Sequence, residues 1–225
     1  MEKKKALVIF SGGQDSTTCL AWAKHRYEEV TAVSFFYGQQ HRIELEQAGY
    51  ISRRLGIPWQ TIDVSFYGSM VRSALTGEGD LCESHADHPE LPASFVPNRN
   101  ALFILLAHSL AQSLECDTLV TGVCQTDFSG YPDCRRDFIE AIQHALNLGA
   151  STSIRIETPL MDLSKADTFK LAEDEGVLDL VLKASHSCYK GSSIMNEWGR
   201  GCGSCPACQL RAKGYRAYKT QYGET

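Results

Sequence analysis

The chain has 225 residues, of which 43% are hydrophobic and 22% are charged, and its formal net charge is −5. These values are typical of a globular protein with one sizeable core, and they argue against a protein that binds nucleic acid through overall positive charge. No apolar run reaches the roughly 20 residues that a membrane-spanning helix requires, and the polar residues 1–5 do not resemble a secretory signal. We therefore expect a cytoplasmic enzyme that binds neither nucleic acid nor a membrane.

Short β-branched runs alternate with amphipathic stretches over roughly the first 160 residues, which is typical of βαβ units. The pattern predicts an α/β fold in which a Rossmann-like parallel sheet is flanked by helices. The predicted strands cover residues 6–10, 30–36, 59–64, 118–122 and 154–157.

Helices are predicted at residues 16–25 and 41–55, and in the second of them Ile43, Tyr50, Ile51 and Leu55 form one apolar stripe. Residues 65–97 are polar and show no sustained period, which predicts a long loop, either mobile or functional.

A third helix is expected up to about Ser113, with Asn98 as its cap. Ser164 and Asp167 form a capping-box pattern that predicts a further helix ending near Gly176. Beyond residue 184 the composition shifts to Cys, Gly, Ser and basic residues. We expect a main domain at residues 1–184 and a small metal-binding segment at 185–225, which ends in a helix from about residue 206.

The first predicted strand runs directly into Ser11-Gly12-Gly13-Gln14-Asp15-Ser16 and then into a predicted helix. Such a turn binds phosphate, because consecutive N–H groups converge on the anion and the helix N-terminus adds partial positive charge. The alternative is a plain turn whose glycines only relieve strain. The segment is neither a Walker A loop nor a dinucleotide fingerprint, since Gly-Lys-Ser/Thr and GxGxxG are both absent.

Three cysteines, Cys202, Cys205 and Cys208, repeat every third residue, and Cys188 lies upstream. Four thiolates can close a tetrahedral shell around Zn²⁺ and leave no open position, which predicts a structural metal. An iron–sulfur cluster and thiols without metal are the alternatives. The other cysteines are interpreted as packing residues; they are Cys19, Cys82, Cys116, Cys124 and Cys134.

The SGGQDS segment resembles the PP-loop of N-type ATP pyrophosphatases, which split ATP into AMP and pyrophosphate while adenylating an oxygen. The resemblance implies that Asp15 helps to organise Mg²⁺ and that Lys165 offsets charge on the departing pyrophosphate. A solvated lysine on an exposed turn is the alternative for Lys165. The ATP-binding residues implied by the resemblance are Phe10, Ser11, Gly12, Gly13, Gln14, Asp15, Ser16, Thr17, Thr18, Cys19 and Leu20.

Four more segments, together with the cysteine spacing, make nearly the whole chain similar to the 7-cyano-7-deazaguanine synthase family. They are Tyr37-Gly38-Gln39-Gln40-His41, Val96-Pro97-Asn98-Arg99-Asn100, Gly122-Val123-Cys124-Gln125-Thr126-Asp127 and Tyr131-Pro132-Asp133-Cys134-Arg135. The resemblance implies an ATP-dependent ligase in queuosine biosynthesis, which converts 7-carboxy-7-deazaguanine and free ammonia to the nitrile through adenylated acid and amide intermediates. It also implies a homodimer.

Arg99 is expected to pair with the substrate carboxylate or a phosphate, with a surface salt bridge as the alternative. Candidate residues for reading the base or stacking on it are Gln39, Asn98, Asn100, Gln125, Asp127, Phe95, Phe128 and Tyr131. Two other functions stay open at this point. One is a PP-loop tRNA-modifying enzyme such as a thiolase, and the other is a zinc-ribbon interaction module on a degenerate nucleotide-binding fold.

Overall fold

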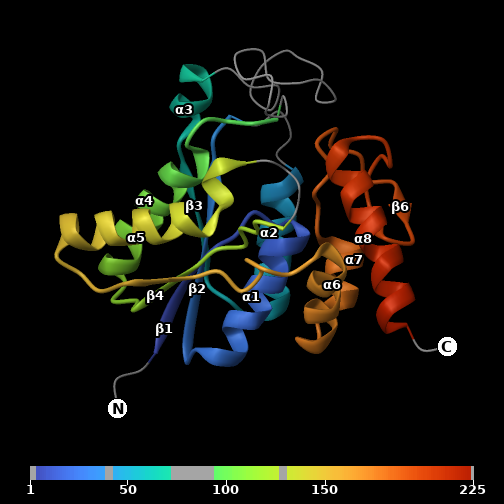
Figure 1. Cartoon of the computed structure of the whole chain (residues 1–225), viewed down its shortest axis with the longest axis horizontal. Helices are drawn as coiled ribbons and strands as arrows, with labels where there is room; N and C mark the ends of the chain where they lie inside the picture. The colour runs from blue at the N-terminus through green and yellow to red at the C-terminus, as the bar shows by residue number, and fades with distance from the viewer. Residues whose placement is uncertain (1–3, 39–42, 72–93, 127–130, 224–225) are drawn as a thin grey trace.

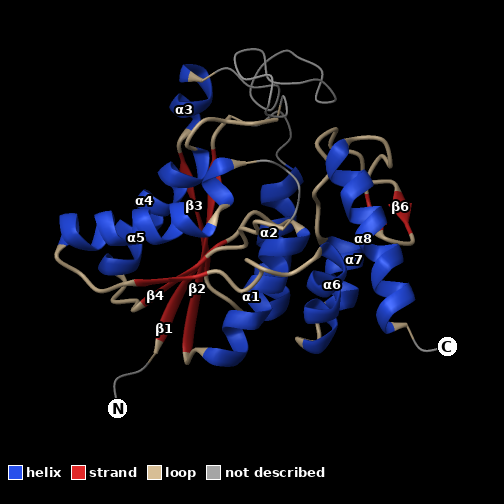
Figure 2. Ribbon diagram, viewed as in Figure 1, coloured by secondary structure: helices blue, strands red, loops and turns tan. Residues whose placement is uncertain are grey.

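The computed structural model describes residues 4–38, 43–71, 94–126 and 131–223. Its main sheet is made of β1 (Lys5–Ile9), β2 (Glu29–Phe36), β3 (Trp59–Asp63), β4 (Thr118–Val120) and β5 (Arg155–Glu157). The strands are parallel and lie in the order β3-β2-β1-β4-β5 (Figure 2). Each strand lies where the sequence predicts it, with small differences at the ends. The predicted α/β fold class is confirmed.

Helices cover both faces of the sheet (Figure 1). One face carries α1 (Gln14–Arg26) and α2 (Ile43–Leu55), and the other carries α4 (Arg99–Ser113) and α5 (Arg136–Ala150). Because successive side chains of a strand point to opposite faces, Val8 of β1 packs towards α1 and α2, whereas Leu7 packs towards α4. Burial on both sides explains why β1 is apolar along its length.

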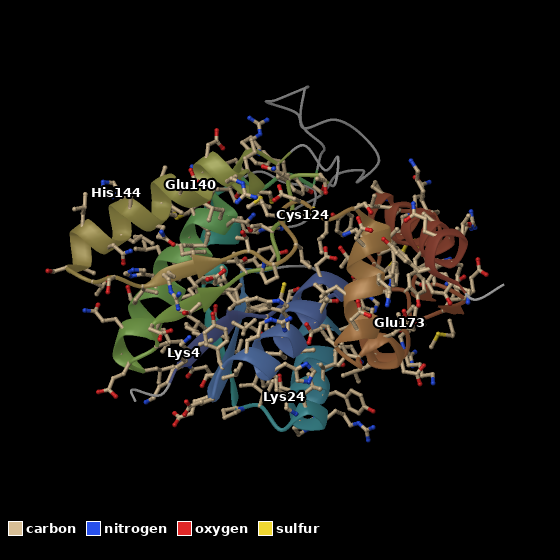
Figure 3. The ribbon with its side chains drawn as sticks, turned by 60° about the horizontal axis from the view of Figure 1, so that its bottom comes forward. Lys4, Lys24, Cys124, Glu140, His144 and Glu173 are labelled. Carbon is tan, nitrogen blue, oxygen red and sulfur yellow. The ribbon has the colours of Figure 1, made fainter. Side chains whose placement is uncertain are left out.

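The C-terminal part lies beside α1, on the right of Figure 1. It contains α6 (Lys165–Asp174), α7 (Leu178–Ala184), the antiparallel pair β6 (Met195–Asn196) and β7 (Gly199–Arg200), and α8 (Pro206–Tyr222). Helix α8 packs along α6. The Tyr218 hydroxyl donates a hydrogen bond at 2.7 Å to Oε1 of Glu173, the residue of α6 that is labelled in Figure 3.

The strand order creates a switch point between β1 and β4. From β1 the chain builds outward through β2 to β3, and then it crosses to the other side of β1 to build β4 and β5. In open parallel sheets the crevice at the carboxyl ends of two such strands is the usual ligand site. The predicted phosphate loop follows β1 directly and therefore lies at this crevice.

Three predicted helix boundaries are confirmed. Ser164 Oγ accepts a hydrogen bond from Asp167 N, and the Asp167 carboxylate accepts one from Ser164 N at 3.0 Å, so the capping box is present. Gly176 follows α6 with φ of 70°, in the left-handed region that ends many helices. The terminal helix begins at Pro206, as expected.

The predicted loop at residues 65–97 is wrong at its start, where α3 (Ser65–Met70) forms. This short helix buries none of its residues, so it lacks the apolar stripe by which a helix is recognised. Residues 72–93, which include Cys82, lie outside the described part of the chain.

Other expectations also need correction. Asn98 precedes α4 in a left-handed conformation, with φ of 54°, and its side chain makes no capping hydrogen bond. Tyr50 is exposed, so it does not continue the buried stripe of α2. The sequence analysis also missed α5, α7 and the β6–β7 pair. None of the described helices is long and apolar enough to cross a membrane.

Candidate active site

The SGGQDS loop joins β1 to the first turn of α1, as predicted. Gly12 has φ of 81°, and a Cβ placed on it would lie 2.6 Å from the backbone oxygen of Glu44 and 2.8 Å from the backbone nitrogen of Ala48. The loop therefore touches the backbone of α2 at a point where no side chain fits. Glycine is required at this position by both conformation and space.

Two serines hold the loop in shape. Ser11 N donates to Ser16 Oγ at 3.2 Å, Gly13 N donates to Ser11 Oγ at 3.3 Å, and the two hydroxyl oxygens are 3.0 Å apart. These hydrogen bonds fix the loop beside the N-terminus of α1, which favours the phosphate-loop interpretation over a plain turn. The first N–H groups of a helix have no intrahelical acceptor and can bind an anion.

A segment distant in sequence supports the loop. Gln14 N donates to Ser187 Oγ at 3.3 Å, and His186 N donates to the carbonyl oxygen of Gly12 at 3.0 Å. The sequence analysis missed these contacts, since nothing local marks Ser187 or His186 as neighbours of a loop more than 170 residues earlier. The chain after α7 therefore helps to fix the geometry of the loop.

Lys165, the first residue of α6, reaches Asp15 in the loop. Its ammonium donates to both carboxylate oxygens, at 3.0 and 2.9 Å. The Lys165 side chain is only 9% exposed, and a Cβ on Gly214 of α8 would lie 2.3 Å from Lys165 Cγ, so α8 covers its aliphatic stem. This burial contradicts the alternative of a solvated lysine and places a cation beside the loop.

A cavity of about 350 Å³ opens at the carboxyl ends of β1 and β4. Six of the residues implied to bind ATP line it: Phe10, Ser11, Gly13, Gln14, Asp15 and Ser16. Gly12 faces α2, and four others are fully buried in α1: Thr17, Thr18, Cys19 and Leu20. Direct contact of these buried side chains with a nucleotide stays a prediction, and their visible role is to pack α1 against the sheet.

Arg99, at the start of α4, lines the same cavity between two aromatic rings. Its guanidinium carbon is 5.7 Å from the ring centroid of Tyr37 and 6.0 Å from that of Tyr131. Burial lowers the pKa of Arg99, but the neighbouring phenol groups raise it further, so the net pKa lies above the ordinary value. A permanent cation held by aromatic faces is available to an anionic substrate group.

Comparison with known proteins agrees with this geometry. A family model described as "Queuosine biosynthesis protein QueC" matches residues 5–219. The chain belongs to the QueC family. A 7-cyano-7-deazaguanine synthase of Helicobacter pylori (strain P12) is 52% identical over 224 residues, which cover 98% of both chains. One of Lysinibacillus sphaericus (strain C3-41) is 46% identical over 225 residues, covering 99% of this chain and 100% of that relative.

Among solved structures, a 4-thiouridine synthetase in complex with RNA and bound ATP is similar in fold. The TM-score is 0.53 at 16% sequence identity, and the match covers 96% of this chain and 54% of that chain. At this identity the likeness concerns the fold alone.

The predicted base-reading residues fall into two groups in this QueC-family structure. Asn100 and Tyr131 line the cavity, and the Asn100 side chain also donates to the Asp133 carbonyl at 3.3 Å. The other six do not line it or lie outside the described residues. The side-chain amide of Gln125, for example, donates to Asp162 Oδ1 at 2.8 Å. Phe95 is buried and stacks on Tyr131, with 6.0 Å between ring centroids.

Asn98 is exposed and lines a separate hollow on the surface. Gln39, Asp127 and Phe128 lie outside the described residues. Only part of the predicted set therefore reaches the cavity within the described chain, and the structure adds Tyr37 and Tyr189 to it. Tyr37 belongs to a segment quoted for the family resemblance. Tyr189 was missed because the sequence analysis interpreted its segment only as a metal site, on account of the neighbouring Cys188.

Glu44, near the start of α2, is a cavity residue that the sequence analysis missed. Burial raises the pKa of its carboxyl group to about 7, while the charge of Arg99 lowers it in part. On an amphipathic helix a glutamate looks like a solvent-facing residue. Only the approach of α2 to the loop, which Gly12 permits, brings it to the cavity.

The four cysteines predicted to bind metal come together. The sulfur atoms of Cys188, Cys202, Cys205 and Cys208 all lie within 4.8 Å of one another, and those of Cys202 and Cys208 are 3.9 Å apart. A tetrahedral Zn²⁺ site with ordinary Zn–S bonds separates its sulfurs by about 3.8 Å. The donor set and spacing therefore fit one tetrahedral ion, whereas an iron–sulfur cluster would spread the thiolates over several irons.

The backbone around the cluster suits thiolates. Cys202 Sγ accepts hydrogen bonds from Cys205 N at 3.3 Å and Ser204 N at 3.4 Å. A hydrogen bond from Cys208 lowers the pKa of the buried Cys205 thiol, which favours its thiolate form. A Cβ on Gly201 would lie 2.5 Å from Cys208 Sγ, so the turn needs glycine there. Amide donors stabilise metal-bound sulfur in the same way.

Arg211 of α8 connects the cysteine cluster to the cavity wall. It is 2% exposed, and it donates to the carbonyl oxygens of Trp198 at 2.9 Å and Val181 at 2.8 Å. Burial lowers the pKa of Arg211 to about 10, which still leaves it charged at neutral pH. The sequence analysis missed this residue because the pattern of α8 does not distinguish a buried arginine from a solvated one.

Proposed function

We propose that this chain converts 7-carboxy-7-deazaguanine, ammonia and ATP to 7-cyano-7-deazaguanine in queuosine biosynthesis. The observation that carries the proposal is the family membership along the full chain, together with a phosphate loop at the switch point of the sheet. The cavity beside that loop also offers a cation, Arg99, for a carboxylate.

Activation by adenylation explains why an ATP loop is needed. A carboxylate is a poor electrophile, because its charge is delocalised and oxide cannot leave, whereas an adenylate has AMP as its leaving group. In our proposal the N–H groups of the loop and Lys165 bind the pyrophosphate part of ATP. Mg²⁺ would supply further charge neutralisation there, with Asp15 as the side chain that holds it.

The same loop serves two successive adenylations. Ammonia displaces AMP from the first adenylate and gives the amide. Adenylation of the amide oxygen, followed by loss of a proton and of AMP, gives the nitrile. The contribution of the protein is to hold the reacting atoms and to stabilise charge, and no covalent enzyme intermediate is required.

We place the deazaguanine between the rings of the cavity. Tyr131 offers an aromatic face, Asn100 offers an amide, and Arg99 pairs with the substrate carboxylate. Arg99 and the loop line the same cavity, so a carboxylate held by the guanidinium is within the space that the loop shares with ATP.

The four-cysteine site is proposed to hold Zn²⁺ in a structural role, supported by the sulfur spacing. Cys188 and Tyr189 line the cavity, so a metal that fixes this segment also fixes part of the substrate wall. The homodimer and the cytoplasmic location remain predictions from the sequence.

The deciding experiment incubates the purified protein with the acid, ATP and ammonium and identifies the products by mass spectrometry. We expect the amide and the nitrile, with AMP and pyrophosphate formed only when the acid is present. Formation of ADP, or of no new deazaguanine, contradicts the proposal. The tRNA-modifying alternative predicts instead that transfer RNA, added with ATP, gains sulfur or another group.

A further inference from the structure

The cavity contains a carboxylate that the adenylation steps do not use. Within the described residues, Asp15 and Glu44 are the two acidic side chains that line it. Lys165 donates to both oxygens of Asp15, whereas Glu44 forms no ion pair within the described part of the chain. Glu44 is therefore the cavity carboxylate that remains open to a ligand.

The position of Glu44 is fixed by the loop itself. Its backbone oxygen lies against Gly12, at the place where a Cβ would come within 2.6 Å. The charge of Arg99 of α4 acts on the Glu44 carboxyl, and Tyr37, which follows β2, is another titratable neighbour within the described part of the chain. Glu44 thus lies between the phosphate loop and the cation that we assign to the substrate carboxylate.

The reaction needs a proton acceptor at this place. Near neutral pH ammonium carries its full set of protons and has no lone pair, so it cannot attack an acyl carbon. A base within the cavity must take one proton before the C–N bond forms. A carboxylate is also a side chain that attracts ammonium, because the two carry opposite charges.

Three other groups that line the cavity are less suited. Lys165 and Arg99 are cations and repel ammonium, and burial raises the pKa of the Cys134 thiol to about 12, so it stays protonated. The partly buried carboxyl of Glu44 has a pKa raised to about 7, which lets it both lose and regain a proton near neutral pH.

We propose that Glu44 binds ammonium in the cavity and removes the proton that releases ammonia for attack. This inference rests on the proposed function. In the step, one proton passes from ammonium to the Glu44 carboxylate, and the freed lone pair forms the C–N bond to the acyl carbon. The bond from that carbon to the adenylate oxygen breaks, its electron pair leaves with AMP, and the surplus proton on nitrogen goes to water.

The test compares Glu44→Gln with Glu46→Gln, an exposed glutamate on the same helix. Three rates are measured at pH 7 with the full chain: acid-dependent exchange of labelled pyrophosphate into ATP, amide formation from ammonium, and hydroxamate formation from hydroxylamine. Hydroxylamine is a weaker base than ammonia and is largely unprotonated at this pH, so it needs no proton acceptor before attack.

We expect Glu44→Gln to keep the exchange rate and the hydroxylamine rate and to lose about 100-fold in the ammonium rate. At higher pH free ammonia becomes abundant, and the ammonium defect should shrink. Glu46→Gln should match the wild type in all three rates. An unchanged ammonium rate in Glu44→Gln overturns the inference, and so does an equal loss with both nucleophiles.

A second variant covers the case in which Glu44→Gln disturbs the loop and loses the exchange. Glu44→Asp retains a carboxylate, so the ratio of its ammonium and hydroxylamine rates should stay within about tenfold of the wild type. If the ratio of the ammonium rate to the hydroxylamine rate in Glu44→Asp falls by about 100-fold, as expected when the base is absent, the inference is overturned. If the wild type itself shows no acid-dependent exchange, the proposed function fails, which is a different result.

Discussion

The phosphate loop and the cysteine cluster adjoin the same cavity, but they obtain their shape in different ways. The loop is held by its own backbone, by Ser11 and Ser16, and by contacts with Ser187 and His186. The cluster consists of four thiols whose sulfurs lie within 4.8 Å of one another, an arrangement that a metal ion stabilises and that thiolates alone oppose by charge repulsion. In our proposal, the loop that binds ATP transiently is preorganised by hydrogen bonds, whereas the cysteine site depends on the metal that it holds.

The largest effect is expected from removing one thiolate. Cys205→Ser should release the metal and lower the free energy of unfolding by about 4 kcal/mol or more, because the remaining donors no longer close the shell. Metal content by plasma spectrometry and thermal unfolding measure both changes. Cys116→Ser is the matched control, since Cys116 is also buried but lies outside the cluster. Full metal content in Cys205→Ser removes this residue from the ligand set.

Removing the charge beside the loop should lower the activity and leave the metal content unchanged. Lys165→Met keeps the stem that packs under α8 and removes the charge beside Asp15, so we expect a loss of about 100- to 1,000-fold in acid-dependent pyrophosphate exchange. Metal content should not change. Lys170→Met on the same helix is the control, because within the described part of the chain Lys170 pairs with two exposed acids, Glu173 and Asp174. Equal activity of the two variants would exclude a catalytic role for Lys165.

Two glycines allow the energetic cost of an unfavourable backbone conformation to be measured separately from the cost of a close contact. Gly12 and Gly176 have similar positive φ values, 81° and 70°, but only Gly12 has atoms within 4 Å of an added Cβ. Gly176→Ala should cost about 1 kcal/mol in unfolding free energy, whereas Gly12→Ala should cost about 1–3 kcal/mol and also impair ATP binding. Chemical denaturation and nucleotide titration measure the two effects. Equal losses in both variants would mean that the contact with α2 has no energetic role.

The sequence predicted those parts of the site whose signal is local. The loop residues, Lys165 within its capping box and the four cysteines all follow from short spacings, and the structure brings each group together. The strand pattern likewise predicted the sheet, because a parallel sheet buried on both faces leaves continuous apolar runs.

The remainder depends on contacts between distant segments. Glu44 and Arg211 are ordinary charged residues of helices until the fold places them at the cavity, and Ser187 supports the loop across 173 residues of sequence. Helix α5 is a different case. Its residues Phe138, Ile142 and Leu146 recur at helical spacing, so its signal was present in the sequence and was overlooked beside the polar motif that precedes it.

The smallest effect is expected where the two regions meet, at the start of α6. Ser164→Ala removes the capping hydrogen bond and should lower the free energy of unfolding by about 1 kcal/mol. Hydrogen bonds from Ser164 and Tyr222 lower the pKa of Asp167. A carboxyl group with a lowered pKa in the folded state stabilises the protein above its unfolded pKa, and this contribution is lost as the pH falls through the folded value. The difference between wild type and variant should therefore be full at neutral pH and diminish in acid. A difference that is independent of pH would assign the effect to the Ser164 hydroxyl alone and would separate the cap of α6 from the charge of Asp167.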